Sequence, residues 1–281
     1  MLLSYSTWGM PRVPIEVAVR HCADLGFDGL ELTVIPGWST DAAHLDRAGR
    51  SRIRALYDDA GLALCGIAGN VPLLAANPDE SRAVMDRFRG YLDLASELQG
   101  PGERLSVSTT SGGKSGEWEA RRPALVERFG ALARHAERTG VVVGAEAHVG
   151  SAMSTPEQVL WLVEQVASPS LRVHFDVSHF NVQGMDMDRV ISQLAPHSHH
   201  THVKDERGRW PDHVFAIPGE GEMDYVRYLR GMRSAGYDQH ITVEVSVMVQ
   251  ARPDYDPLDA AARSYRVLAD AFAEAGIERA R

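Results

Sequence analysis

The chain has 281 residues, of which 44% are hydrophobic, and a formal net charge of −9 at pH 7. This length and apolar content suffice for one large core, and α/β barrels of this size are commonly single domains. The negative charge provides no general attraction for nucleic acid or an anionic membrane, so small polar molecules are the expected partners.

Short apolar runs alternate with amphipathic stretches along the whole chain, which predicts repeated strand–helix units around a parallel sheet. The expected strands, in chain order, are Leu2–Ser6, Gly29–Thr33, Ala63–Ala68, Arg104–Ser108, Val141–Ala147, Arg172–Asp176, His199–Lys204 and Ile241–Val245. The expected helices between them are Pro14–Leu25, Ala48–Ala60, Asp79–Leu98, Trp118–Thr139, Thr155–Val166, Met187–Leu194, Tyr225–Ala235 and Asp259–Ala275. Eight such units predict an α/β fold, a single (β/α)8 TIM barrel over residues 1–281.

Turn signals support these boundaries. Gly26, Gly61, Gly140 and Gly236 each follow an expected helix and precede a strand, where glycine suits the left-handed conformation that ends a helix. The segment Ser154-Thr-Pro-Glu157 resembles a capping box at the start of a helix. An open doubly wound sheet is the alternative fold, but no Gly-x-Gly-x-x-Gly turn follows the first strand.

Four of the expected strands carry, at or near their C-terminal end, a residue that can bind a metal: Glu146, Asp176, His202 and Glu244. A charged side chain at the end of an apolar strand is costly unless something there needs it. In a TIM barrel the C-terminal ends of the strands meet around one mouth. Three carboxylates and one imidazole form a mostly oxygen ligand set, so the sequence predicts one divalent cation. Mn²⁺ is the first choice, with Mg²⁺, Co²⁺ and Zn²⁺ as alternatives.

Two further histidines lie beside the predicted ligands. His148 is two residues after Glu146 and therefore shares its strand face, and His179 follows Asp176 by three residues in the next turn. Each is interpreted either as a contact to the substrate or as a hydrogen-bond partner that orients a ligand.

Other polar and aromatic residues near the strand ends are weaker candidates. Lys204 and Glu31 are interpreted either as substrate contacts or as members of buried ion pairs. Trp8 and Trp210 are interpreted either as residues that stack on a sugar ring or as ordinary packing residues. His174 is expected to be a core histidine with satisfied ring nitrogens, and His200 a deeper polar core residue.

Several short motifs occur in a characteristic order: Gly26-Phe-Asp-Gly-Leu-Glu-Leu32, Glu146-Ala-His148, Asp176-Val-Ser-His179, His202-Val-Lys-Asp205, Pro218-Gly-Glu-Gly-Glu222 with Asp224, and Thr242-Val-Glu244. Together they resemble the sugar phosphate isomerase/epimerase family of xylose isomerase-like barrels. That family includes ketose 3-epimerases, hydroxypyruvate isomerases, inosose isomerases and dehydratases, 3-dehydroshikimate dehydratases, keto-glycoside deglycosidases and the endonuclease IV branch.

The resemblance implies that Glu146, Asp176, His202 and Glu244 bind the metal, and that Glu146 and Glu244 also act as an acid/base pair. Removal of a proton from a carbon next to a carbonyl leaves an enediolate, whose charge a cation stabilises. Two carboxylates can take that proton from one face and return it to another, or move it between neighbouring carbons. His179 and one of Arg207 or Arg209 are implied to bind substrate oxygens.

The predicted function is therefore a metal-dependent isomerase or epimerase of a keto-sugar or polyol ketone. Ketose 3-epimerases carry a further acid shortly after the Glu of strand five, where this chain has Ala152 and its neighbours. This departure favours, as an alternative, a lyase on the same substrates: a dehydratase, or a deglycosidase that expels the aglycone of 3-keto-glycosides, C-glycosides included.

Two other functions are disfavoured or open. DNA repair by the endonuclease IV chemistry needs additional histidines on strands two and three, and residues 31–33 and 64–70 contain none. A catalytically silent barrel is the third alternative. The sequence is compatible with a homo-oligomer or with a subunit of a hetero-oligomer.

A cytoplasmic protein is expected. The first residues lack the pattern of a secretion signal, and no apolar stretch approaches the eighteen residues of a membrane span. Cys22 and Cys65 lack metal-ligand spacing and are interpreted as reduced, buried thiols.

Overall fold

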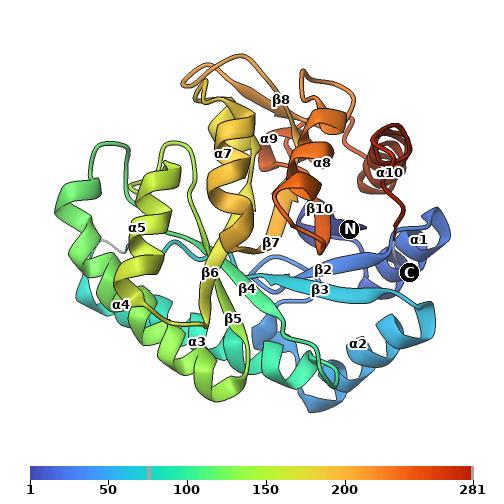
Figure 1. Cartoon of the computed structure of the whole chain (residues 1–281). Helices are drawn as coiled ribbons and strands as arrows, with labels where there is room; N and C mark the ends of the chain where they lie inside the picture. The colour runs from blue at the N-terminus through green and yellow to red at the C-terminus, as the bar shows by residue number, and fades with distance from the viewer. Residues whose placement is uncertain (75–76, 280–281) are drawn as a thin grey trace.

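A computed structural model describes residues 1–74 and 77–279. Eight parallel strands form a closed barrel in the order β1-β10-β7-β6-β5-β4-β3-β2, and helices surround it (Figure 1). The strands are β1 (Leu2–Ser6), β2 (Gly29–Thr33), β3 (Ala63–Ala68), β4 (Ser106–Thr110), β5 (Val142–Glu146), β6 (Leu171–Asp176), β7 (Ser198–Val203) and β10 (His240–Val243). The predicted (β/α)8 barrel is confirmed, and the open sheet is wrong.

The expected helices are all present with small shifts at their ends. They are α1 (Ile15–Leu25), α2 (Arg47–Ala60), α3 (Pro78–Leu98), α4 (Trp118–Thr139), α5 (Pro156–Val166), α7 (Met187–Leu194), α8 (Tyr225–Ser234) and α10 (Pro257–Glu274). Gly26 and Gly140 end α1 and α4 with φ angles of 95° and 74°, in the left-handed region that glycine tolerates. The capping box of α5 lies one residue later than expected, because Thr155 pairs with Gln158.

The structure also contains short elements that the sequence does not predict. An antiparallel hairpin, β8 (Asp205–Arg207) with β9 (Val214–Ala216), follows β7. One-turn helices α6 (Ser178–Asn181) and α9 (Val247–Gln250) follow β6 and β10, and 3-10 turns occupy Thr7–Gly9, Ala42–His44 and Ala195–His197. The hairpin and α9 contact each other beyond the C-terminal ends of the strands, so they build the mouth of the barrel.

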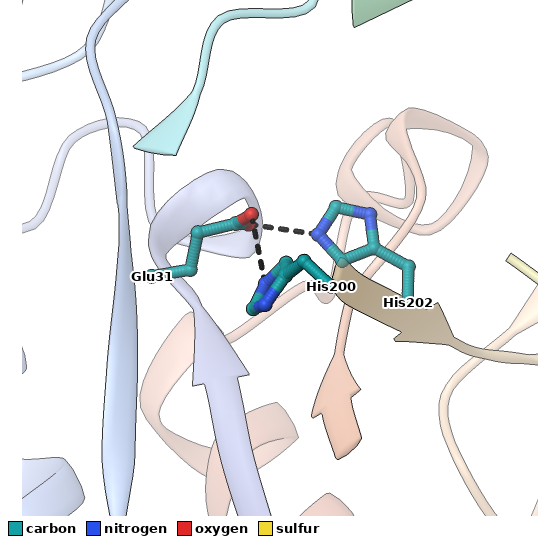
Figure 2. A group of neighbouring side chains, drawn as sticks. All are labelled: Glu31, His200 and His202. Atoms are coloured by element: carbon teal, nitrogen blue, oxygen red, sulfur yellow. Dashed lines mark hydrogen bonds and ion pairs between the residues drawn. The ribbon is translucent and has the colours of Figure 1, made fainter. Parts of the chain in front are cut away.

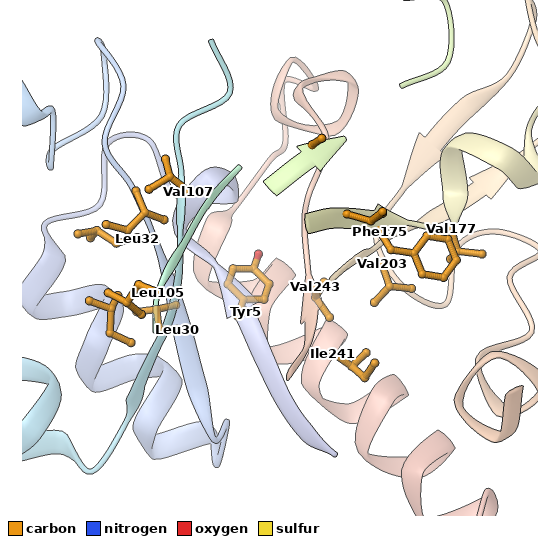
Figure 3. Close-up of a cluster of buried hydrophobic side chains, with 14 of the residues drawn as sticks. Tyr5, Leu30, Leu32, Leu105, Val107, Phe175, Val177, Val203, Ile241 and Val243 are labelled. Carbon is orange, nitrogen blue, oxygen red and sulfur yellow. The ribbon is translucent and has the colours of Figure 1, made fainter. Parts of the chain in front are cut away.

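Side-chain alternation along the strands separates an apolar shell from a polar interior. Leu30, Leu32, Phe175 and Val203 belong to the buried hydrophobic cluster that Figure 3 shows among the strands and helices. Between the two leucines, Glu31 points the other way and reaches β7 across the barrel. The hydrophobic core therefore lies mainly outside the strands, which leaves the inside for polar groups.

None of the helices in the described ranges is long and apolar enough to cross a membrane.

Candidate active site

The four predicted ligands lie at the C-terminal ends of neighbouring strands. Glu146 and Asp176 are the last residues of β5 and β6, His202 is the penultimate residue of β7, and Glu244 directly follows β10. Strand register places Asp176 beside His202, and His202 beside Thr242, two residues before Glu244. All four side chains are buried, and Glu244 has the largest exposed fraction, 5%.

The structure brings these four residues together. Ligand atoms of Asp176, His202 and Glu244 lie within 4.8 Å of one another. Glu146 joins them through two overlapping groups of the same size, one with Asp176 and His179 and one with His174 and His202. Buried carboxylates this close repel one another unless a cation lies among them.

Lys204 supplies one such cation from the protein itself. Its Nζ lies 2.7 Å from Asp176 Oδ2 and also donates a hydrogen bond to Glu244. Burial opposes the charge on Lys204, but Asp176, Glu244 and Glu146 outweigh burial and raise its pKa. The pKa of Asp176 is lowered in turn, since Lys204 and the neighbouring imidazoles outweigh burial there. Lys204 therefore forms the buried ion pair considered above, and it also lines the cavity described below.

Glu31 lies beneath His202 and has no exposed surface. Its Oε2 lies 2.8 Å from His202 Nε2, and its Oε1 lies 3.3 Å from His200 Nε2 (Figure 2). Burial favours a neutral Glu31, but the charge and hydrogen bonds of the two imidazoles hold its pKa well below the ordinary value. Burial likewise opposes a charged His202, but Glu31 and Glu244 raise its pKa to about 9. Glu31 thus has the contacts of the buried ion pair considered above, and it does not line the cavity.

His148 and His179 form a pair of neutral rings in contact, tilted by 41°, beside the carboxylates. Their ring centroids lie 3.8 Å apart, and His179 Nε2 lies 3.5 Å from Glu146 Oε1 and 3.4 Å from Asp176 Oδ2. Burial lowers the pKa of His148 to about 4 and that of His179 to about 3. Both rings are therefore uncharged at neutral pH. Burial, the largest effect on Glu146, raises the pKa of that carboxyl.

A cavity of about 500 Å³ opens above these groups. The predicted site residues that line it are Trp8, Glu146, His148, His179, Lys204 and Glu244. Trp8 stacks on Trp38 with 4.8 Å between ring centroids, so its position is fixed from behind. A larger open groove, of about 890 Å³, lies between α8 and α10 and contains none of the predicted residues.

The two candidate arginines are not brought to this cavity. Arg207 is exposed at the end of β8, and it is not among the residues that line the cavity. Arg209 lines a separate hollow with Glu206 and Glu222, and its guanidinium bonds to the carbonyl of Gly208. The positions of both side chains differ from the expected substrate contact, because the hairpin β8–β9 turns this loop away from the metal-ligand residues.

The sequence does not single out Phe215 or Val247, which come from the short elements, although it does offer Trp210 as a residue that stacks on a sugar ring. Trp210 and Phe215 from the hairpin, and Val247 from α9, form the upper wall of the cavity. The run Val214-Phe-Ala216 was the available signal, but three residues are too few for a strand pattern.

His174 also differs from expectation. Among the described residues, neither of its ring nitrogens has a hydrogen-bond partner, although the ring is buried against His202 at 4.2 Å between centroids. The expectation that the ring nitrogens of His174 are satisfied is therefore wrong.

Comparison with known proteins identifies the family. A family model described as the xylose isomerase-like TIM barrel matches residues 19–271. The chain belongs to this family. The resemblance inferred from the motifs is confirmed by this match.

Two curated relatives of this xylose isomerase-like barrel are enzymes, as the sequence predicted for the chain itself. Fructoselysine 3-epimerase of Escherichia coli O157:H7 is 26% identical over 259 residues, which cover 88% of this chain and 91% of the relative. Inosose dehydratase of Salmonella typhimurium (strain LT2) is 24% identical over 196 residues, which cover 63% of each chain.

Solved structures share the fold of this xylose isomerase-like barrel at lower identity. The IOLI protein with a bound zinc atom superposes with a TM-score of 0.81 at 17% identity, over 98% of this chain and 99% of that one. A xylose isomerase-like barrel from Mycobacterium smegmatis in complex with magnesium gives a TM-score of 0.72 at 17% identity, over 98% and 97% of the two chains.

Proposed function

We propose that this protein is a divalent-metal-dependent isomerase or epimerase of a keto-sugar or polyol ketone. The observation that carries the proposal is that two carboxylates, Glu146 and Glu244, face one cavity above the Asp176–His202 pair. The curated relatives, an epimerase and a dehydratase, act by name on sugars or cyclic polyol ketones, which supports the same substrate class.

The residues present suit a divalent cation. Glu146, Asp176, His202 and Glu244 would hold it, because they offer carboxylate oxygens and an imidazole nitrogen within a few ångströms of one another. His202 Nδ1 is buried and has no hydrogen-bond partner among the described residues, so in the neutral ring no protein contact competes with a cation for it. When bound, the cation supplies positive charge where negative charge develops on the substrate oxygens.

Glu146 and Glu244 handle the proton. One carboxylate removes the proton next to the carbonyl, and the C–H electron pair forms a carbon–carbon double bond while the carbonyl oxygen takes the negative charge. The other carboxyl, initially protonated, returns a proton to the same or the neighbouring carbon. His148 and His179, both neutral, are suited to hold substrate hydroxyls at the cavity floor.

Hydrogen exchange with solvent tests this proposal. The Mn²⁺-loaded protein is incubated with a panel of keto-sugars in D₂O, and deuterium at the carbon next to the carbonyl is measured by NMR and mass spectrometry. We expect incorporation that Glu146→Gln and Glu244→Gln abolish. A panel without incorporation, at full metal loading, would contradict the proposed chemistry.

A lyase is the second candidate, and the upper wall of the cavity favours it. Trp210 is 47% exposed and Val247 is 54% exposed, although both side chains line the cavity. Exposed apolar groups at a cavity mouth commonly mark a contact surface, here one suited to an aglycone attached to the sugar. Release of the aglycone from a 3-keto-glucoside would favour the lyase, whereas deuterium uptake with the aglycone retained would favour the isomerase.

Three finer expectations belong to the same proposal. Mn²⁺ is the proposed physiological cation, and the zinc and magnesium in the neighbouring structures support divalent-metal use without distinguishing among metals. A cytoplasmic location is proposed, in keeping with the free thiols of Cys22 and Cys65. Assembly as an oligomer is proposed because the exposed apolar residues at the mouth could also be covered by another subunit.

A further inference from the structure

Glu31 is a buried acid that the proposed chemistry does not use. It projects from the middle of β2 into the barrel and meets two histidines of β7, His200 and His202 (Figure 2). The pairing of Glu31 with His202 joins residues 171 positions apart in the chain. A carboxylate with no exposed surface is costly, so the contact with the two rings has to account for its presence.

The chemistry of this contact fixes which nitrogen of His202 carries a proton. An ionised carboxylate can only accept hydrogen bonds, so Nε2, at 2.8 Å from Glu31 Oε2, must be the donor. In the neutral ring the lone pair then lies on Nδ1. Nδ1 faces the other side, 3.6 Å from Glu244 Oε1, and has no hydrogen-bond partner among the described residues.

The Glu31 carboxylate is itself held in place. Ser6 Oγ donates a hydrogen bond to Oε2 at 2.5 Å, and His200 approaches Oε1 from below. His200 in turn lies 3.3 Å from Thr242 Oγ1 and packs on Gly66, where an added Cβ would lie only 3.1 Å from its Nε2. Residues of four strands, β1, β3, β7 and β10, thus fix the position of Glu31 before any ligand binds.

We propose that Glu31 is a positioning residue that locks the His202 ring, so that Nδ1, and not Nε2, binds the cation. The inference rests on the metal site proposed above. Carboxylates that accept the second N–H of a metal-binding histidine commonly orient the ring and increase its basicity. Glu31 touches neither the cavity nor the cation, and it acts through His202 alone.

The direct test is the protonation pattern of the His202 ring in wild-type protein. Protein labelled with ¹⁵N in histidine is loaded with Zn²⁺, which is diamagnetic, and long-range ¹H–¹⁵N spectra are recorded. The His202 signals are assigned by their loss in His202→Asn. We expect Nε2 to be protonated and Nδ1 to be metal-bound. Zn²⁺ bound through Nε2 would overturn this inference alone, whereas failure to bind any Zn²⁺ would overturn the metal site as well.

A variant pair tests the energetic consequence. Glu31→Gln keeps the shape of the side chain, but its amide can also donate to Nε2 and so stabilise the wrong tautomer. We expect its affinity for Mn²⁺ or Zn²⁺, measured by calorimetry, to fall about 10- to 100-fold. Glu206→Gln is the matched control, because Glu206 is also a buried acid but bonds to Asn181 and to no proposed ligand. Equal metal affinity in the two folded variants would contradict the positioning role.

Discussion

Replacement of Lys204 by Met should make the metal-free protein less stable and yet make metal binding tighter. The ammonium lies 2.7 Å from Asp176 Oδ2, bonds to Glu244, and is 3% exposed. Removal of one partner from a buried ion pair costs about 3–5 kcal/mol, because the charges left behind have no counter-ion. We therefore expect the free energy of unfolding of the metal-free variant to fall by about that amount.

The same geometry predicts the opposite effect on metal affinity. In wild-type protein a cation must displace the Lys204 ammonium from two of its own ligands, whereas in Lys204→Met the ligands are free. If displacement costs about 1.4–2.8 kcal/mol, the Kd for Mn²⁺ is about 10- to 100-fold lower in the variant.

Denaturant unfolding with and without Mn²⁺, together with calorimetry, measures both effects. Lys114→Met is the matched control, because Lys114 is the only other lysine of the chain and is exposed. A variant that binds Mn²⁺ no more tightly than wild type would refute the idea that Lys204 and the cation share one place.

Three further predictions follow from other residues. Glu146→Gln and Glu244→Gln should each reduce turnover about 10²- to 10⁴-fold, the usual contribution of a general acid or base. Steady-state kinetics at saturating Mn²⁺ measures this effect, and a variant that keeps wild-type turnover would reject the paired mechanism. Burial outweighs the hydrogen bond from Asn181 and raises the pKa of Glu206 to about 8, above the value of roughly 4.3 in the unfolded chain. The stabilisation that protonated Glu206 contributes to the fold is therefore complete below pH 4 and is lost as the pH rises through 8. Wild type should therefore lose roughly 2–5 kcal/mol more stability than Glu206→Gln between pH 5 and pH 8.5, and parallel pH profiles of unfolding would contradict this. Trp210→Ala should raise the KM for a keto-glycoside with an apolar aglycone several-fold more than the KM for a free keto-sugar, and equal changes would remove the aglycone from the proposal.

The barrel and the ligand positions could be predicted because they depend on local patterns. Short apolar strands with Glu146 or Asp176 as the last residue, or with Glu244 directly after it, reveal both a strand and its direction, and the (β/α)8 closure then brings the ends together. The alternation Leu30-Glu31-Leu32 likewise predicts a strand with one inward acid.

Partners across the barrel could not be predicted in this way. The contact between Glu31 and His202 depends on the shear and tilt of the closed sheet, which no local pattern encodes, so the sequence alone leaves substrate contact and ion pair as equal alternatives for Glu31. The sequence likewise does not decide whether Lys204 contacts the substrate or forms an ion pair, because its partner Asp176 lies on another strand.

The hairpin that follows β7 could not be predicted because its two strands, β8 and β9, are short. The direction of Arg207 and Arg209 is set by hairpin β8–β9, and each of its strands has three residues. The hairpin is fixed through Asp205, whose carboxylate accepts backbone hydrogen bonds from Gly219, Gly221 and Met223. Such side-chain-to-backbone anchoring appears only once the fold is known.

The most direct test of the central claim is a crystal structure of the Mn²⁺-soaked protein with anomalous diffraction data. The account predicts one anomalous peak within bonding distance, about 2.0–2.4 Å, of Glu146, Asp176, Glu244 and Nδ1 of His202, with the Lys204 ammonium displaced. The absence of a peak at saturating Mn²⁺, or a peak elsewhere while Lys204 keeps its contacts to Asp176 and Glu244, would contradict it.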